Sequence, residues 1–428
     1  MTLAVILALV VWLGVLTSPA AGPAVPVEGP TVARAGPAVP GTHAATTGPW
    51  TPSAVGATAA AVAAPAAEAA IPDLAPHAAS AVLMDAATGR VIWSKNANAP
   101  RQAASITKLM TMALVLDAIR AGRLKWTEDI SASEGAVHTA GSQIWLELGE
   151  NMTVKDLFIA VAVASANDAA YALAEHVGGT YDNFIAMMNA KAKELGMKDT
   201  VYRNPHGLDE TGQQTSAYDI ALLSRYLVTQ DPQVLKYSSL WEYRLRNNKL
   251  WLVNRNRLLK MFAGADGLKT GFTTGAGYGL AATALRGTTR MIAVVLGEPT
   301  SELRFTEAAQ VLQYGFAHYV TPASWQPGQK VAAVPVEVGT APTVDVHPAT
   351  AFGVTVPRGR GAEVESQVQL PLFVRAPVTK GQRVGEINVT VGGAPAGSVP
   401  LVAAAAVPRV GPFGLFGRLF LAGWPWLR

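Results

Sequence analysis

Three short apolar segments that follow one another along the chain constrain the fold most. Residues 267–271, 278–285 and 290–296 have the composition of β-strands, and Gly-containing turns separate them. Two earlier apolar runs, residues 81–85 and 91–93, surround a Thr-Gly pair and predict a β-hairpin. A hairpin and a later strand meander with helices between them predict helices packed on an antiparallel sheet, an α+β fold.

The region between the predicted hairpin and the strand meander has helical patterning. Leu109, Met112, Leu116 and Ile119 recur at helical spacing, which indicates a helical face buried in a core. Residues 153–156 (Thr-Val-Lys-Asp) are typical of a helix-capping box. The predicted helices are residues 105–119, 157–164, 168–177 and 183–195.

Beyond Thr321 the pattern changes to short alternating strands between Pro and Gly residues. We therefore predict an α+β domain over residues 76–321 and a small all-β sandwich domain over residues 322–407. The predicted strands of the second domain are residues 331–338, 343–346, 353–356, 364–372 and 386–391.

The two ends of the chain carry the evidence for its compartment. Residues 1–21 resemble an export signal, with an apolar run that leads to Ser18-Pro19-Ala20, although no Lys or Arg precedes the run. Residues 22–75 are rich in Ala, Pro and Gly and predict a disordered linker. Residues 408–428 place several Phe and Leu side chains on one side and predict an amphipathic membrane anchor. A terminal core helix of the β domain is the alternative. The predicted location is therefore the outer face of the cytoplasmic membrane.

Composition excludes several classes of function. The 428 residues include no cysteine, which removes thiol catalysis, cysteine-ligated metals and disulfides. Half of the chain is apolar and 15% is charged, as expected for a folded globular protein. The formal charge of +4 is small and forms no Lys/Arg stripe, so we expect no nucleic-acid partner. His206 has no spaced partners that suggest a metal site, and we expect a turn or core residue there. No cofactor is predicted.

Residues 105–108 (Ser-Ile-Thr-Lys) place a hydroxyl and an amine on one face of a predicted helix. A serine hydroxyl is a weak nucleophile and needs a base. An amine can be that base only if burial or a cationic neighbour keeps it largely neutral. Lys269, on a predicted strand, is a candidate for that neighbour. By itself the pattern is more typical of a helix cap with a solvated lysine.

Two further motifs follow in order. In residues 165–167 (Ser-Ala-Asn), Ser165 can pass a proton to a leaving group and Asn167 can hold a substrate amide. In residues 269–271 (Lys-Thr-Gly), Lys269 and Thr270 can bind a terminal carboxylate, and Gly271 lets a substrate backbone come close to the strand. A helix cap and a strand end with a surface lysine are the alternatives for these two motifs.

The ordered set of three motifs resembles the signature of penicillin-binding proteins and class A β-lactamases. From about residue 76 onward the chain is similar to the low-molecular-mass penicillin-binding proteins that are D-alanyl-D-alanine carboxypeptidases. Further similar segments are residues 206–209 (His-Gly-Leu-Asp), 266–273 (Asp-Gly-Leu-Lys-Thr-Gly-Phe-Thr), 276–278 (Ala-Gly-Tyr) and 357–359 (Pro-Arg-Gly).

The resemblance implies a serine peptidase that removes the terminal D-Ala from peptidoglycan stem pentapeptides and reacts covalently with β-lactams. It implies Ser105 as nucleophile, Lys108 as general base and Ser165 as proton relay. Substrate contacts are implied for Asn167, Lys269, Thr270 and Gly271. The backbone N–H groups of Ser105 and Phe272 are implied to form an oxyanion hole, and Arg304 to reach the substrate carboxylate.

Three alternatives stay open at this point. A β-lactamase-like hydrolase would need a dedicated glutamate and a Ser-Asp-Asn middle motif, whereas this chain has Ser-Ala-Asn. A DD-endopeptidase differs in the length of its substrate. A non-catalytic wall-binding protein would have a degenerate site, whereas this chain has every expected catalytic side chain.

Overall fold

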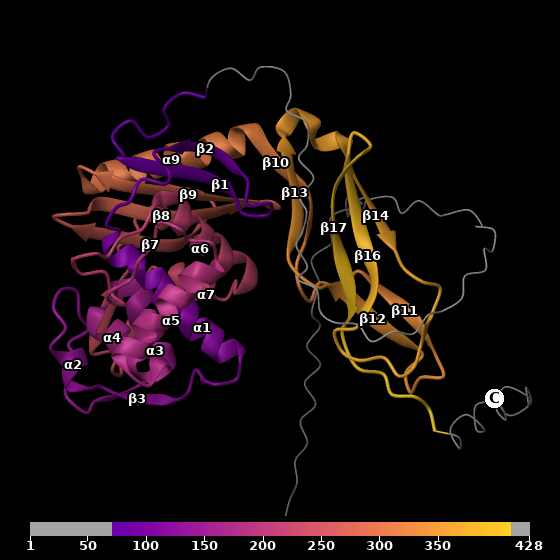
Figure 1. Ribbon diagram of the computed structural model, residues 1–428, viewed down its shortest axis with the longest axis horizontal. Coiled ribbons are helices and arrows are strands. Elements are labelled where there is room, and N and C mark those ends of the chain that lie inside the picture. The colour runs from indigo at the N-terminus through magenta and orange to yellow at the C-terminus, as the bar shows by residue number, and fades with distance from the viewer. Residues whose placement is uncertain (1–70, 412–428) are drawn as a thin grey trace, which may run out of the picture. The chain divides into compact units, whose positions relative to one another are not determined.

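The computed structural model describes residues 71–411. Its first part is built on a five-stranded antiparallel sheet with the order β2-β1-β9-β8-β7 (Figure 1). The strands are β1 (Ser80–Asp85), β2 (Val91–Lys95), β7 (Ala265–Thr273), β8 (Gly277–Arg286) and β9 (Thr289–Glu298). The predicted hairpin and the three predicted later strands are all present. They form one sheet because β1 pairs with β9, with Ala81 opposite Val295.

The two faces of this sheet pack against different sets of helices (Figure 1). Leu83 and Val295 point to the face that is covered by α9 (Ser301–His318), where Phe305 and Leu312 are buried. Alternate residues such as Val294 point to the opposite face and join the larger helical core. This alternation follows from the two-residue period of a β-strand. Both faces are therefore buried.

The helical layer lies between β2 and β7 in the chain. It contains the single-turn 3₁₀ helix η1 (Ala104–Thr107), α1 (Lys108–Arg120), α2 (Glu134–Val137), α3 (Val154–Ile159), a π-helical turn η2 (Ala160–Ala164), α4 (Asn167–Gly178), α5 (Tyr181–Glu194), α6 (Ala217–Gln230), α7 (Val234–Ser238) and α8 (Leu258–Met261). Short strand pairs accompany them: β3 (Asp129–Ser131) with β4 (Asn151–Thr153), and β5 (Glu242–Leu245) with β6 (Leu250–Val253).

The predicted helices are confirmed, and α1 differs from its prediction in one respect. Its spacing predicted one buried face, whereas every residue from Lys108 to Leu116 is buried and Ile119 is only half-buried. The helix therefore runs through the centre of the helical layer. The predicted cap of α3 is present, since the Thr153 hydroxyl accepts a hydrogen bond from the Asp156 backbone N–H at 3.1 Å.

The second part of the chain is a separate all-β unit with its own apolar core, which contains Val346, Ile387 and Leu401. A six-stranded sheet has the order β14-β16-β17-β12-β11-β15, and a two-stranded sheet pairs β10 with β13. The strands are β10 (Tyr319–Trp325), β11 (Ala332–Glu337), β12 (Thr343–Pro348), β13 (Phe352–Pro357), β14 (Val364–Gln369), β15 (Val374–Arg375), β16 (Arg383–Val391) and β17 (Ala394–Ala403). The short 3₁₀ helix η3 (Arg358–Glu363) follows β13 at the predicted Pro-Arg-Gly turn.

The sequence did not predict β10, β15 or β17. Strand β17 lies inside the six-stranded sheet although it contains Pro395, Gly397 and Pro400, residues that usually interrupt a strand. It pairs with β16 with two irregularities in the register, one of which lies opposite Pro395 and Gly397.

The ends of the predicted domains need small adjustments. Leu74 and Ala75, assigned to the linker, are buried against the sheet. Strand β10 begins at Tyr319, before the predicted boundary at residue 322. The predicted signal (residues 1–21) and most of the predicted linker and anchor lie outside the described residues. Among the helices of residues 71–411, none has the length and apolar composition that crossing a membrane would require.

Candidate active site

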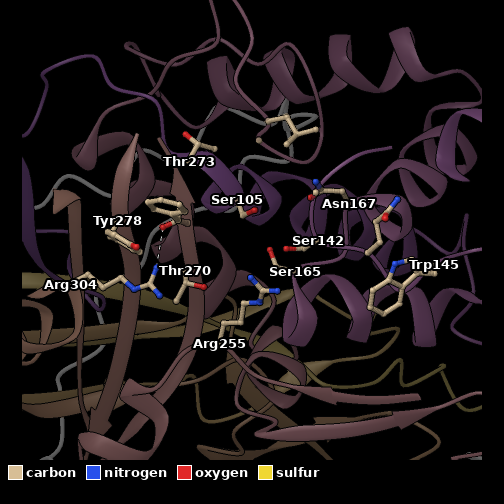
Figure 2. A pocket seen from close by; sticks show the side chains of 16 residues that line it. Ser105, Ser142, Trp145, Ser165, Asn167, Arg255, Thr270, Thr273, Tyr278 and Arg304 are labelled. Atoms are coloured by element: carbon tan, nitrogen blue, oxygen red, sulfur yellow. Dashed lines mark hydrogen bonds between the residues drawn. The ribbon is translucent and has the colours of Figure 1, made fainter. Parts of the chain in front are cut away.

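A cleft of about 500 Å³ opens where η1, the edge strand β7 and the loops of the helical layer meet (Figure 2). It brings together residues that are far apart in the sequence. Its lining consists of Ser105, Gly141, Ser142, Gln143, Trp145, Ser165, Asn167, Gly207, Leu208, Arg255, Thr270, Gly271, Phe272, Thr273, Tyr278 and Arg304. The three sequence motifs thus meet at one cavity, with Lys108 and Lys269 buried behind its surface.

Ser105 lies on the 3₁₀ turn η1, directly before α1. Two glycines allow other segments to pack closely on this turn. A Cβ at Gly207 would lie 1.9 Å from the carbonyl oxygen of Ala104, and one at Gly271 would lie 2.5 Å from that of Ala103. The prediction for Gly271 was a close approach of substrate. The observed close approach is that of the protein's own turn, which positions Ser105 against β7.

The Lys108 amine is fully buried and has three polar neighbours. Its Nζ lies 2.9 Å from the Ser105 Oγ. It also lies 2.6 Å from both the Asn167 Oδ1 and the backbone carbonyl oxygen of His206 and donates hydrogen bonds to both. The spacing of three residues on a helix therefore gives the predicted contact between the hydroxyl and the amine.

The pKa of Lys108 lies well below the usual range of a lysine. Burial is the main cause, because it disfavours the charged form. The positive charges of Lys269 and Arg255 act in the same direction, while Asp168 opposes them. The prediction that Lys269 helps to neutralise this amine agrees with the direction of that effect.

His206 is buried and contributes its backbone carbonyl to Lys108. Burial, together with the nearby Lys108, lowers the pKa of its ring to about 3, so the imidazole is neutral. Its Nδ1 accepts a hydrogen bond from the Leu208 backbone N–H at 3.3 Å. Within residues 71–411, no group of three His, Cys, Asp or Glu side chains has a geometry that could hold a metal ion.

Ser165 and Asn167 lie at the break between two helices, as predicted. Ser165 follows the π-helical turn in a left-handed conformation, with φ of 63°, and lines the cleft. Such backbone conformations are costly for residues other than glycine and are concentrated at functional sites. The amide of Asn167 bridges two parts of the protein, because its Oδ1 accepts from Lys108 and its Nδ2 donates to the Ala140 carbonyl at 2.6 Å. The amide predicted to hold substrate thus also holds the Lys108 amine in place.

One end of the cleft concentrates positive charge. Lys269 is 2% exposed, and burial together with Arg255 and Arg304 lowers its pKa to about 7. Its Nζ donates a hydrogen bond to the Thr270 backbone carbonyl at 3.0 Å. We call Arg255, Lys269 and Arg304 the cation end. Across residues 71–411, no ion pair joins any of them to a carboxylate.

Arg304, which the resemblance implied as a contact of the substrate carboxylate, lines the cleft. It is 8% exposed on α9, and its guanidinium donates to the Gly271 carbonyl and the Ser301 hydroxyl, each at 3.1 Å. Burial lowers its pKa to about 10, which leaves it charged at neutral pH. Arg255 was missed by the sequence analysis. It follows β6 in a segment with no motif, and only its position in the cleft identifies it.

The backbone of Phe272 lies on β7 at the cleft, next to Ser105's turn. Its side chain is half-exposed and stacks on Tyr278, with ring centroids 4.1 Å apart. Strand β7 is the last strand of its sheet, so one side of this strand has no neighbouring strand within the sheet. An extended peptide can pair with such an edge.

A serine hydroxyl beside a buried lysine amine, on helices packed over an antiparallel sheet, is the arrangement of the penicillin-recognising serine enzymes. Family models agree. The model described as D-alanyl-D-alanine carboxypeptidase matches residues 65–300, and that described as penicillin-binding protein 5, C-terminal domain, matches residues 319–409. The chain belongs to the D-alanyl-D-alanine carboxypeptidase family.

Individual relatives extend over most of the chain. It is 37% identical to the D-alanyl-D-alanine carboxypeptidase DacF of Bacillus subtilis, over 82% of this chain and 91% of the relative. Penicillin-binding protein 5 from Haemophilus influenzae has 33% identity and a TM-score of 0.60, and the match covers 78% of this chain and 98% of that structure. Penicillin-binding protein D2 from Listeria monocytogenes, in a cefotaxime-bound form, has 34% identity and a TM-score of 0.52, over 56% of this chain and 97% of that structure.

Proposed function

We propose that this protein is a serine D-alanyl-D-alanine carboxypeptidase that removes the terminal D-alanine from peptidoglycan pentapeptide stems. The single observation that carries the proposal is the 2.9 Å contact between the Ser105 Oγ and a buried Lys108 amine whose pKa is lowered. Family membership supports the choice of substrate.

Lys108 is proposed as the general base. A neutral primary amine has two N–H donors and one lone pair. Two of its neighbours, the Asn167 Oδ1 and the His206 carbonyl, can only accept hydrogen bonds at this distance. Both N–H groups are thereby used, and the lone pair is left for the hydroxyl hydrogen of Ser105. The three neighbours therefore match the neutral amine and favour proton transfer from Ser105.

The reaction proposed for this cleft proceeds through an ester. The Ser105 oxygen attacks the carbonyl carbon between the two D-alanines, and its proton moves to Lys108. The backbone N–H groups of Ser105 and Phe272 stabilise the oxyanion. The C–N bond then breaks, and the proton returns through Ser165 to the departing amine. Water next attacks the ester with Lys108 as base, which releases the shortened peptide and restores the Ser105 hydroxyl.

The cation end is proposed to bind the carboxylate of the terminal D-alanine. It has positive charge without a protein carboxylate to neutralise it, and Thr270 adds a hydroxyl at the cleft surface. The peptide would lie along the free edge of β7, so its scissile bond would come to Ser105. A substrate carboxylate would also stabilise the charged form of Lys269.

β-Lactams are proposed as covalent inhibitors that acylate Ser105, and the cefotaxime-bound relative from Listeria supports this. The β-lactamase alternative is less favoured, because Asn167 follows a Ser-Ala pair and the second domain matches penicillin-binding protein 5. An endopeptidase would use the same chemistry on a cross-linked peptide, so substrate length separates the two activities.

The deciding experiment measures D-alanine release from a purified pentapeptide and from a cross-linked peptide dimer. We expect release from the pentapeptide and much slower cleavage of the dimer. The Ser105→Ala variant should lose both this activity and labelling by a fluorescent penicillin. Labelling that persists in Ser105→Ala would refute the nucleophile, and preferential cleavage of the dimer would favour the endopeptidase.

We also propose that the protein is exported and acts at the outer face of the cytoplasmic membrane, held there by residues 408–428. The apolar run of residues 3–16 and the Phe and Leu pattern near the C-terminus support this. A chain truncated after Val407 should move from the membrane to the soluble fraction and keep its activity on small peptides. A truncated protein that stays with the membrane would contradict the anchor.

A further inference from the structure

The indole of Trp145 is the most exposed large apolar side chain at the cleft. It is 67% exposed, compared with 50% for Phe272, the other such side chain in the lining. Phe272 stacks on Tyr278. By contrast, no aromatic ring, cation or hydrogen-bond partner contacts the Trp145 indole anywhere in residues 71–411. A tryptophan face is therefore presented to the cleft without a partner from the protein.

The backbone that carries this indole is held firmly. Trp145 has φ of 55°, in the left-handed region that is unfavourable for a bulky residue. On both sides of it, the buried Asp168 carboxylate accepts hydrogen bonds from the backbone N–H groups of Ile144 (3.0 Å) and Leu146 (3.2 Å).

A second set of hydrogen bonds holds the backbone carbonyl groups of the same loop. Arg246 donates to the carbonyls of Ile144 at 2.7 Å and Trp145 at 3.0 Å. Its remaining N–H groups bind the Glu150 carboxylate at 2.7 and 2.8 Å. An exposed tryptophan without a binding role does not require its backbone to be fixed by both Asp168 and Arg246. A binding surface, in contrast, gains affinity when it is fixed before its ligand arrives.

The place of the indole in the cleft indicates which part of a substrate it meets. In Figure 2, Arg304 and Tyr278 lie on one side, Trp145 lies on the other, and Ser105 and Ser165 lie between them. A peptide whose terminal carboxylate is at the cation end and whose scissile carbonyl is at Ser105 must extend toward Trp145. The residue that comes next along it is the one before the two D-alanines.

The surface around Trp145 suits a substrate residue with a long aliphatic side chain that ends in an amine. The face of an indole attracts both methylene groups and cations. Glu147, two residues further along the loop, is exposed and forms no ion pair with another residue of the described chain, so it adds negative charge to the loop that carries the indole. The charge of Glu150, in contrast, is neutralised by Arg246.

We propose that Trp145 forms a subsite for the side chain of the residue preceding D-Ala-D-Ala, and that this subsite prefers an aliphatic chain with a terminal ammonium group. The inference rests on the proposed function and adds a specificity determinant to it. Trp145 is a binding residue here and takes no part in bond breaking.

The test uses three N-acetylated tripeptides, X-D-Ala-D-Ala, in which X is glycine, norleucine or lysine with a free amine. For the full-length protein, kcat/KM should rise in the order glycine, norleucine, lysine. In Trp145→Ala, kcat/KM for the lysine peptide should fall by about tenfold, while that for the glycine peptide should change less than about twofold. Trp145→Phe keeps an aromatic face and should retain most of the preference.

A matched control is Trp251→Ala, which removes another exposed tryptophan that does not line the cleft. It should leave all three values unchanged. An equal loss for all three peptides in Trp145→Ala, or an unchanged preference for lysine, would overturn the subsite.

Binding measurements separate this outcome from a failure of the proposed function. Calorimetry with the Ser105→Ala protein should give tighter binding of the lysine peptide than of the glycine peptide, and adding Trp145→Ala should abolish the difference. If wild-type protein releases no D-alanine but this binding difference is present, the proposed reaction fails and the subsite stands. If D-alanine is released and the difference is absent, the subsite fails alone.

Discussion

The centre of the cleft and its cation end each bury a lysine, but the polar and charged neighbours of the two amines differ. Lys108 has three hydrogen-bonding neighbours from the protein, none of which is a carboxylate. Lys269 has one backbone carbonyl and two arginines nearby. Both pKa values are lowered, that of Lys269 to about 7. At the centre the protein supplies every hydrogen-bond partner that a neutral amine needs. At the cation end it supplies no carboxylate, so a ligand can neutralise the positive charge.

This difference separates the two tasks that an acyl transferase assigns to cationic residues. A base must be neutral before the reaction, so it needs acceptors for its N–H groups and no anion beside it. A carboxylate clamp gains most from the ligand when the protein offers no competing anion.

Replacing the base should have the largest effect. Lys108→Met removes the amine and leaves a side chain of similar length, and we expect kcat for D-alanine release to fall by about 10²–10⁴-fold. Penicillin labelling should slow in parallel. The melting temperature serves as the control for folding, because the substitution leaves the Asn167 Oδ1 and the His206 carbonyl without their donor. Near-normal acylation in a folded Lys108→Met protein would show that another group is the base.

Lys269→Met removes the amine that is proposed to bind the substrate carboxylate. This loss should weaken transition-state binding by about 2–4 kcal/mol, so we expect kcat/KM to fall by about 10²-fold. A peptide with a C-terminal amide in place of the carboxylate provides the second arm of the test. For the wild-type protein, kcat/KM should be lower for the amide than for the carboxylate peptide by a similar factor. For Lys269→Met, kcat/KM should differ little between the two peptides. Additive losses would mean that Lys269 acts on something other than the carboxylate.

The pH dependence of KM should report the charge state of Lys269. With a pKa near 7, the amine is mostly charged at pH 6 and mostly neutral at pH 8. Carboxylate binding requires the charge, so KM should rise by up to about tenfold between these pH values. Lys269→Arg stays charged throughout and should flatten this dependence. If KM is independent of pH in both the wild-type protein and Lys269→Arg, the protonation of Lys269 does not control substrate binding.

Glu298 is buried but does not line the cleft, so it shows what burial does to an acid that we give no role in catalysis. Burial and the neighbouring Glu307 carboxylate raise the pKa of Glu298 to about 8. The fold favours its protonated form, so its contribution to stability is complete below the unfolded pKa of about 4.3 and is lost as pH rises through 8. We expect the free energy of unfolding to fall by about 1–2 kcal/mol between pH 6 and pH 9. Glu298→Gln should reduce this fall, and thermal denaturation at the two pH values measures it.

Local patterns made the centre of the cleft predictable from the sequence. Ser105 and Lys108 are three residues apart, at the junction where η1 continues into α1, so their contact follows from helical geometry. Ser165 and Asn167 were placed at a helix break, and the strand that carries Lys269 followed from its Gly-bounded apolar pattern. The same kind of local pattern predicted the five strands of the first sheet.

Features that depend on distant packing were beyond the sequence. Arg255 belongs to no motif and reaches the cleft only through the path of the chain after β6. The amide of Asn167 was expected to hold substrate, and its contacts to Lys108 and Ala140 depend on three separate segments meeting. Strand β17 was missed because Pro395 and Pro400 conceal a strand whose place is fixed by its neighbours.

The free edge of β7 has a consequence for the behaviour of the protein in solution. An unpaired strand edge is a template on which a second copy of the same chain can assemble. Here Arg255 and Arg304 line the cleft beside that edge, so two molecules that approach through it bring like charges together. The groups proposed to attract the substrate thus also discourage edge-to-edge aggregation, and substitutions that neutralise them carry a cost in solubility as well as in catalysis.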